Sequence, residues 1–303
     1  MAEIETRCGF VALIGAPNAG KSTLLNALVG AKLSIVTHKV QTTRGIVRGI
    51  AMAGASQLVF VDTPGIFQPR RRLDRAMVTT AWGGAADADI VCLLVDAQRG
   101  LDESNSAILE KLSSSNQHKV LVLNKVDTVK PQTLLELAAI LNRAQAFHRT
   151  FMVSALTGSG VADLAAYLAE VVPAGPWLYP EDQISDAPMR ALAAEITREK
   201  LFLRLHDELP YESTVETTLW TTMKDGSAKV EQTIYVAREG HKKIVIGKGG
   251  ETIKAISMAA RKEIAAMAEA PIHLFLFVKV RENWSDDPER YREMGLEFPH
   301  DKG

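Results

Sequence analysis

Short apolar runs separated by helical stretches dominate the first half of the chain. Buried parallel strands are typically such continuous hydrophobic runs, whereas amphipathic helices repeat with a period near 3.6 residues. Strand and helix therefore alternate, which predicts an α/β domain with a mostly parallel sheet and helices on both faces. Residues 46–53 are more mixed and favour an antiparallel edge strand. The apolar runs are residues 10–14, 58–61, 90–95, 120–123 and 151–153.

The character of the chain changes after residue 172. Four prolines and a glycine follow within a short stretch, and proline fixes φ and removes a backbone donor. We therefore expect an inter-domain linker at this point. The expected division is a first domain over 1–172, a linker over 173–187, a second domain over 188–283 and a tail over 284–303.

The second half predicts a compact α+β domain in the order helix, strand, strand, glycine turn, helix, strand. A short tail helix is expected around Glu289, and Trp284 is expected to pack the tail. The expected elements are a helix over 189–209, strands over 214–223 and 229–237, a strand-like run at 244–246, a helix over 249–267 and a strand over 272–280.

Bulk composition narrows the class of protein. A length of 303 residues suits two domains, and the net charge of −1 means that any nucleic-acid binding must come from a local patch. Cys8 and Cys92 are the two cysteines and lie far apart, which argues against a disulfide scaffold or a zinc site. The chain has no apolar run of membrane-spanning length and begins without a signal or transit pattern, so we expect a cytoplasmic location.

A complete phosphate-binding loop follows the first apolar run. Gly15-Ala16-Pro17-Asn18-Ala19-Gly20-Lys21-Ser22 matches G-x-x-x-x-G-K-[ST] between a strand and a helix. Its backbone N–H groups and the helix N-terminus would hold the phosphates of a nucleoside triphosphate, and the Lys21 ammonium would span the β- and γ-oxygens. The loop residues expected to contact nucleotide are Gly15, Asn18, Ala19, Gly20, Lys21, Ser22 and Thr23.

Three further positions point to Mg²⁺ and the γ-phosphate. Asp62-Thr63-Pro64-Gly65 follows the second apolar run, where a carboxylate can hold Mg²⁺ and Gly65 can offer its N–H to the γ-phosphate. Either Thr42 or Thr43 would add a second hydroxyl to Mg²⁺ beside that of Ser22 and order its loop when GTP is present. We favour Thr43. The expected metal ligands are Ser22, Thr43 and Asp62, and the expected catalytic residues are Lys21, Thr42, Thr43, Asp62 and Gly65.

Two later motifs predict guanine specificity. Asn124-Lys125-Val126-Asp127 follows the fourth apolar run. The Asp127 carboxylate can accept both the N1–H and the exocyclic amine of guanine, a donor pair that adenine lacks. The other residues expected to bind the nucleotide are Asn124, Lys125, Ser154, Ala155 and Leu156 on the guanine side and Thr63 near the phosphates. Ile66 stands where Ras-like proteins carry the glutamine that orients the attacking water, so we expect slow intrinsic hydrolysis.

A second nucleotide-reading signature lies near the end of the chain. Gly247-Lys248-Gly249-Gly250 precedes an amphipathic helix, a setting in which a G-x-x-G turn clamps about four unpaired nucleotides. Residues 241–262 hold six Lys/Arg and one acidic residue, although residues 188–280 hold 14 basic and 12 acidic residues, so the positive charge is local. The expected RNA-binding residues are Lys242, Lys243, Ile246, Gly247, Lys248, Gly249, Gly250 and Lys254.

Together, these motifs resemble the Era family of bacterial ribosome-assembly GTPases over nearly the whole chain. The pairing of one GTPase domain with one C-terminal type II KH domain is the specific signal. The resemblance implies that the protein binds the single-stranded 3′ end of 16S rRNA in the small (30S) subunit, with GTP favouring the RNA-competent state. It also implies a K⁺ ion beside Asn18 that stimulates hydrolysis. We expect a monomer.

Two other functions stay open from the residues. One is a GTPase of tRNA modification, although that family carries a large helical domain and a C-terminal cysteine that this chain lacks. The other is an RNA-binding module that senses guanine nucleotide with little turnover. Whether the basic patch also makes weak peripheral contact with the inner face of the cell membrane is left open by the sequence.

Overall fold

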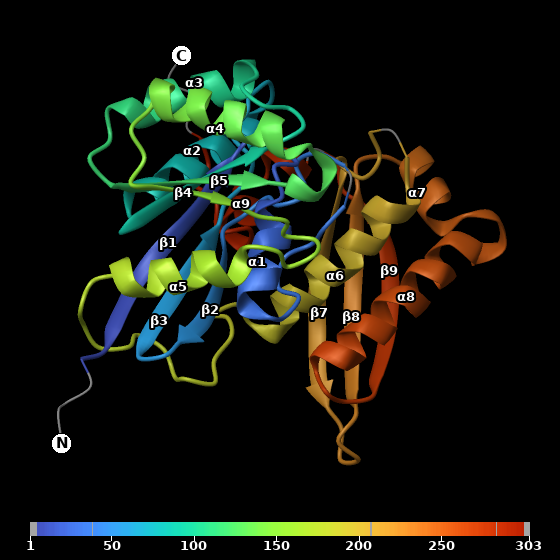
Figure 1. Cartoon of the computed structure of the whole chain (residues 1–303). Coiled ribbons are helices and arrows are strands. Elements are labelled where there is room, and N and C mark those ends of the chain that lie inside the picture. Colours follow the sequence, from blue (N-terminus) through green and yellow to red (C-terminus); the bar gives the residue numbers. More distant parts are fainter. Residues whose placement is uncertain (1–4, 38, 207, 283, 300–303) are drawn as a thin grey trace. The chain divides into compact units, whose positions relative to one another are not determined.

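The computed structural model describes residues 5–37, 39–206, 208–282 and 284–299. The chain divides into two compact units (Figure 1). The first unit contains residues 1–34, 40–186 and 292–303, and the second contains residues 35–39 and 187–291. Each unit therefore includes one segment that sequence order alone assigns to the other.

A six-stranded sheet in the order β2-β3-β1-β4-β5-β6 forms the centre of the first unit. All neighbouring strands run parallel except β2, which pairs antiparallel with β3 at one edge. This confirms the mostly parallel sheet and the antiparallel edge strand expected from the hydrophobic pattern. The strands are β1 (Arg7–Gly15), β2 (Val47–Ala53), β3 (Ser56–Asp62), β4 (Ile90–Asp96), β5 (His118–Asn124) and β6 (Arg149–Met152).

Helices cover both faces of this sheet (Figure 1). Helices α2, α3 and α4 share one apolar core with β1, β4 and β5, while α1 and α5 contact each other and the other side of the sheet. The parallel β1, β3 and β5 end at the same edge, which gathers the loops that follow them. The helices are α1 (Lys21–Val29), α2 (Arg72–Ala86), α3 (Glu103–Ser113), α4 (Pro131–Ala144) and α5 (Val161–Val171), and η1 (Val126–Thr128) is a 3₁₀ turn.

The proline-rich stretch expected as a linker lies against the first unit. The Cys8 N–H donates to the Pro173 carbonyl at 3.1 Å, and the Ile50 N–H donates to the Ile184 carbonyl at 2.9 Å. The Gln57 side-chain amide donates to the Tyr179 carbonyl at 2.8 Å. Residues 173–186 are thus tied by hydrogen bonds to β1, β2 and β3.

The second unit contains a three-stranded sheet in the order β7-β8-β9, with helices on one face. Strands β7 and β8 pair antiparallel, and β8 and β9 pair parallel. Helices α6, α7 and α8 contribute the apolar side chains that pack on the inner face of β8. The elements are α6 (Met189–Arg204), β7 (Ser213–Thr222), β8 (Ala228–Val236), α7 (Glu239–Ile246), η2 (Lys248–Gly250), α8 (Glu251–Met267), β9 (Ile272–Val280), η3 (Trp284–Asp286) and α9 (Pro288–Glu293).

One expectation about this unit is wrong. Residues 244–246, taken as strand-like, form the last turn of α7. Val245 is buried and Ile244 is 57% exposed, a difference between neighbours that a helix of 3.6 residues per turn produces by aiming them at different faces. The glycine turn therefore joins two helices, which is the helix–turn–helix arrangement of a KH domain.

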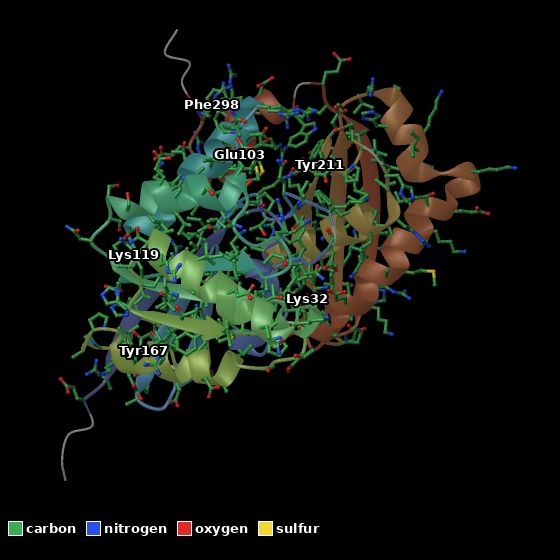
Figure 2. All side chains as sticks on the ribbon, turned by 45° about the horizontal axis from the view of Figure 1, so that its top comes forward. Lys32, Glu103, Lys119, Tyr167, Tyr211 and Phe298 are labelled. Carbon is green, nitrogen blue, oxygen red and sulfur yellow. The ribbon has the colours of Figure 1, made fainter. Side chains whose placement is uncertain are left out.

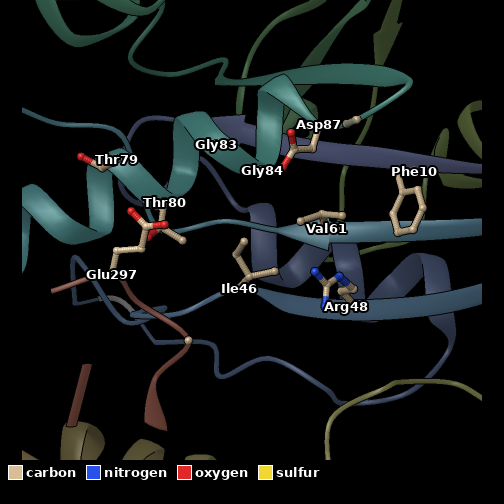
Figure 3. A pocket seen from close by; sticks show the side chains of 12 residues that line it. Phe10, Ile46, Arg48, Val61, Thr79, Thr80, Gly83, Gly84, Asp87 and Glu297 are labelled. Atoms are coloured by element: carbon tan, nitrogen blue, oxygen red, sulfur yellow. The ribbon is translucent and has the colours of Figure 1, made fainter. Parts of the chain in front are cut away.

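The end of the chain packs in the first unit. A Cβ atom on Gly45 would lie 2.1 Å from the Met294 carbonyl oxygen, so the tail passes directly over this glycine. Phe298 is labelled in Figure 2. Its ring centroid lies 5.2 Å from the guanidinium carbon of Arg72. A cavity of about 390 Å³ lies between β2, β3, α2 and the tail (Figure 3). The residues expected to bind nucleotide do not line it.

Candidate nucleotide and RNA sites

Lys21 is the first residue of α1, and its side chain reaches back into the loop that connects β1 to this helix. Its side chain is 6% exposed, and its ammonium donates to the carbonyl oxygens of Gly15 and Ala16 at 3.2 and 3.1 Å. Burial lowers the pKa of this ammonium from 10.5 to about 8, although the negative charge of Asp62 acts to raise it. The amine is therefore held by the loop itself, in the position where a phosphate chain would take over its hydrogen bonds.

The three expected metal ligands lie together. Ser22 Oγ donates to Asp62 Oδ2 at 2.7 Å and lies 2.9 Å from Thr43 Oγ1. Burial raises the pKa of Asp62 above its ordinary value, while Lys21 and the hydroxyls oppose the rise. Asp62 Oδ1 is buried and has no hydrogen-bond partner in the described part of the chain. Two hydroxyls and a carboxylate with an unsatisfied oxygen are the hard oxygen donors that suit Mg²⁺.

Thr43 and Thr42 differ in their surroundings. Thr43 is 7% exposed and reaches Ser22, whereas Thr42 is only partly buried. Thr63 is fully buried, and its hydroxyl donates to the Leu13 carbonyl at 2.9 Å, so its side chain joins β3 to β1. Gly65 lies against the phosphate loop, because a Cβ atom there would be 3.0 Å from Pro17 Cα.

Asn124 connects the phosphate loop to the guanine loops. Its Nδ2 donates to the Ala19 carbonyl at 2.8 Å, and its Oδ1 accepts the Ala155 N–H at 3.0 Å. The amide also fills the space beside Gly20, where a Cβ atom would lie 2.1 Å from Asn124 Nδ2. Asn124 thus holds three loops in register rather than simply facing the base.

The remaining guanine-loop residues line the same edge of the sheet. Asp127 is exposed in the η1 turn, where its carboxylate is accessible to a base. Lys125 has a positive φ of 65° and pairs with Asp96 at 2.6 Å. The Ser154 N–H donates to the Ser159 carbonyl at 2.9 Å, and Leu156 is 82% exposed.

Asp96 is a site residue that the sequence reading missed. It lies opposite Asn124 in the β4–β5 register and anchors the Lys125 ammonium. The available signal was its position, since it is a carboxylate directly after the third apolar run. Charged residues at the carboxyl ends of parallel strands share one edge of a sheet.

Ile66 is buried rather than directed at a phosphate. It is 7% exposed, packs in the core with α2 and β1, and its N–H donates to the Gly15 carbonyl at 3.0 Å. Gln68 is exposed. Ile66 therefore offers no polar side chain that could orient an attacking water.

The second unit presents the glycine turn between α7 and α8. Gly247, Gly249 and Gly250 have φ values of 75°, 60° and 80°, which residues with a Cβ atom rarely adopt. A Cβ atom on Gly247 would lie 2.3 Å from Thr252 Oγ1, whereas Gly249 and Gly250 face open space. Gly247 is thus required for packing, and the other two leave the backbone accessible to a phosphate.

Basic side chains surround this turn. Lys243, Lys248 and Lys254 are exposed, while Lys242 and Ile246 are partly buried. The outer sides of α7 and α8 carry side chains that extend into solvent (Figure 2). The positive N-terminal end of α8 adds to their field, so the surface around the turn has the charge that favours an anion.

A fold with a phosphate loop, a guanine-reading edge and a separate glycine-turn domain defines a class, the P-loop GTPases that carry a KH domain. Residues 10–125 match the family described as a 50S ribosome-binding GTPase, and residues 208–285 match the KH domain family. The chain is 70% identical over 296 residues to GTPase Era of Rhizobium meliloti (strain 1021), covering 98% of this chain and 95% of the relative. It is 69% identical over 295 residues to GTPase Era of Brucella suis biovar 1 (strain 1330), covering 97% and 95%. The chain belongs to the Era family of GTPases.

Solved structures agree with this assignment. A crystal structure of Era in complex with MgGDPNP and nucleotides 1506–1542 of 16S ribosomal RNA is similar with a TM-score of 0.91 and 34% identity, covering 96% of this chain and 99% of that one. A single-residue variant of Aquifex aeolicus Era bound to GDP.AlF4- matches with the same score, identity and coverage. The protein is therefore a GTPase that uses guanine nucleotide and Mg²⁺, and the tRNA-modification alternative is excluded.

Proposed function

We propose that this protein is a GTP-driven switch that binds the single-stranded 3′ end of small-subunit rRNA and acts in 30S assembly. The observation that carries the proposal is the presence of a nucleotide site and an exposed glycine turn in one chain. A related protein in complex with MgGDPNP and 16S rRNA nucleotides supports the choice of RNA. We expect a cytoplasmic monomer. No helix in the described ranges is both long and apolar enough to cross a membrane.

The site residues have separate roles in GTP hydrolysis. Lys21 gives up its contacts with Gly15 and Ala16 and bonds the β- and γ-phosphate oxygens. Ser22, Thr43 and Asp62 would hold Mg²⁺, which neutralises charge on the phosphates when it is bound. Asp127 selects guanine.

Ile66 leaves the attacking water without a positioned amide, so intrinsic turnover is slow. We expect a K⁺ ion, held with the help of Asn18, to supply positive charge between the phosphates and to raise the rate. Asn18 has a φ of 64° in the phosphate loop and is exposed, which leaves its amide accessible to such an ion.

The segment before Thr43 supports coupling between the two activities. Residues 35–39 belong to the second unit, although the residues on either side belong to the first. The Val36 N–H donates to Glu199 Oε1 at 3.0 Å, and the Lys39 ammonium donates to the Phe202 and Leu205 carbonyls at the end of α6. When GTP and Mg²⁺ order Thr43, the change is therefore transmitted along the chain to residues 35–39, which belong to the RNA-binding unit.

A salt-bridge network extends this coupling to α8, which it meets at Glu263 near the C-terminal end of that helix. The Lys200 ammonium pairs with Glu199 Oε2 at 2.6 Å and also with Glu263 on α8. Since α8 begins at the glycine turn, Glu199 lies between residues 35–39 and the RNA-contacting helix. Two discrete arrangements of this network would give RNA-competent and RNA-released states.

The test of RNA recognition is binding of a labelled RNA matching the 3′ end of 16S rRNA and of a scrambled RNA with the same composition. Gly249→Asp places a carboxylate where a phosphate would approach, and Gly249→Asn is the matched neutral control, since both residues tolerate a positive φ. We expect preference for the 3′-end sequence and a larger loss for Gly249→Asp than for Gly249→Asn. Equal binding of both RNAs by the wild type, or no effect of Gly249→Asp, would contradict the proposal.

A further inference from the structure

The sheet of the second unit has an outer face that is only partly covered. Val230, Ile234 and Val236 point to the helices and are fully buried, so the alternate positions on β8 face outward. At one end of this outer face the Arg290 guanidinium lies 2.8 Å from the Glu216 carboxylate and 4.6 Å from the Tyr235 ring. Helix α9 therefore covers β7 and β8 at that end, whereas the outward residues of β9 stay exposed along the strand.

The part of the outer face that α9 leaves open carries aromatic and basic side chains. On β9, alternate residues from His273 to Lys279 are exposed, and the two between them are Phe275 and Phe277, each 47% exposed. Leu219 on β7 is also exposed, and Lys229 on β8 is paired in register with His273. We name these six residues the outer aromatic patch: Leu219, Lys229, His273, Phe275, Phe277 and Lys279.

The two phenylalanines are arranged to receive planar groups. Residues two apart on a strand are about 6.7 Å apart along it, so each ring has room for a separate partner. The Lys229 ammonium lies 5.6 Å from the Phe275 ring centroid and pairs with Glu231 at 2.6 Å. Among the described residues Lys279 has no ion pair. The two rings, with Lys229 on β8 and Lys279 on β9 beside them, offer stacking faces next to contacts for phosphates.

This chemistry favours unpaired RNA. Bases stack on exposed aromatic side chains of an open sheet, and the lysines neighbouring such rings contact the backbone. Stacking is tolerant of sequence, because every base has a π-face. An added β-strand from a protein partner would instead pair with the backbone edge of β9 and would not use the two rings on its outer face.

Strand β9 links the outer aromatic patch to the helices that flank the glycine turn. Strand β9 is at the edge of the sheet and contacts α7 and α8, which flank the turn. The same strand therefore borders the expected RNA groove with its edge and presents the two phenylalanines on its outer face.

We propose that the outer aromatic patch is a second RNA-binding surface, which stacks bases of the strand that leaves the glycine turn and passes around the edge of β9. The proposal rests on RNA binding at the glycine turn. It extends the expected footprint from about four nucleotides to a longer one, and it adds affinity without adding sequence selectivity.

The test compares a short single-stranded RNA of about four nucleotides, the length a glycine turn clamps, with one at least about twice as long. We expect the wild type to bind the longer RNA more tightly. In the double variant Phe275→Ala/Phe277→Ala the longer RNA should lose at least about fivefold in affinity, and the short RNA should not. Met223→Ala, at a residue that is also 47% exposed but lies in the β7–β8 turn, is the matched control and should lose nothing.

A second readout reports stacking directly. In Phe277→Trp, we expect indole fluorescence to be quenched by the longer RNA and not by the short one. Full affinity of the double variant for the longer RNA, with no quenching in Phe277→Trp, would overturn the proposal. If the double variant loses binding to anionic lipid vesicles but keeps its affinity for the longer RNA, the patch is a membrane surface and the proposal is overturned. If Gly249→Asp leaves the short RNA bound, the proposed function fails first, which separates the two failures.

Discussion

At the residue scale, Asn124 explains how two distant motifs act together. The sequence places it after β5 as a base-contacting residue, but its two buried hydrogen bonds join the phosphate loop to the 154–156 loop. Removing a buried partner costs about 1–3 kcal/mol, so its loss would weaken the protein before any base is bound. A local motif reveals that the residue is required, whereas only the fold reveals what it holds.

Asp127→Asn should change the base that is bound. The carboxylate accepts two hydrogen bonds from guanine, whereas an amide presents one acceptor and one donor, which suits the N1–H and 2-oxo group of xanthine. We expect GTP affinity to fall by at least about 10²-fold and xanthosine triphosphate to bind more tightly than GTP. Fluorescent-nucleotide competition measures both. Continued preference for GTP would show that Asp127 does not contact the base.

Lys21 should make GTP binding depend on pH. Burial lowers the pKa of its ammonium to about 8 in the protein without nucleotide, and bound phosphates favour the charged form and raise that pKa. Above pH 8 the free protein loses the proton that the complex needs, so affinity falls as pH rises and binding takes up protons. Titration calorimetry in buffers of different ionisation enthalpy should find greater proton uptake at pH 8.5 than at pH 7.5. Equal uptake at the two values would contradict the assignment.

Asn18 should make hydrolysis respond to the monovalent cation. We expect a higher GTPase rate in K⁺ than in Na⁺ for the wild type and equal rates for Asn18→Ala. Because Asn18 has a positive φ, Asn18→Gly is the control that removes the amide without backbone strain. Equal wild-type rates in the two salts at the same ionic strength would exclude a role for K⁺.

At the element scale, two features escaped the sequence pattern for different reasons. Residues 244–246 are three consecutive apolar residues, a run too short for its period to distinguish a strand from the end of a helix. In β9 the inner Leu274 and Leu276 and the outer Phe275 and Phe277 are all apolar. The strand therefore reads as buried on both faces, although its phenylalanines are exposed.

The segment of residues 35–39 gives the element-scale prediction. Lys39→Met keeps the aliphatic stem and removes the charge that caps the C-terminal end of α6. A cation at a helix C-terminus contributes up to about 1 kcal/mol, so the ratio of RNA affinities with GTP analogue and with GDP should shrink by up to about fivefold. Lys224→Met, in the exposed β7–β8 turn, should leave that ratio unchanged. An unaltered ratio in Lys39→Met would exclude these residues from the coupling.

At the scale of the whole molecule, the order of motifs predicts most of both sites. Asp62 and Asn124 were placed correctly at the ends of β3 and β5, because a strand and the motif that follows it are adjacent in sequence. The exchange of residues 35–39 and 292–303 between the units was not predictable. It depends on contacts such as that of Val36 with Glu199, 163 residues apart, for which a single sequence contains no local signal.

The exchanged segments connect the two activities through the chain itself. Residues 35–39 precede the metal-ligating Thr43, and the tail that follows α9 packs over Gly45 in the first unit. Nucleotide and RNA should therefore each change the affinity of the other by the same factor, as linkage requires.

The most direct test of this account is the affinity of wild-type protein for the 3′-end RNA, measured with a non-hydrolysable GTP analogue and Mg²⁺ and again with GDP and Mg²⁺. The account predicts tighter binding with the analogue, by about 5- to 150-fold, which is the usual range of coupling between two sites. Equal affinities in the two states would contradict a GTP-driven RNA switch.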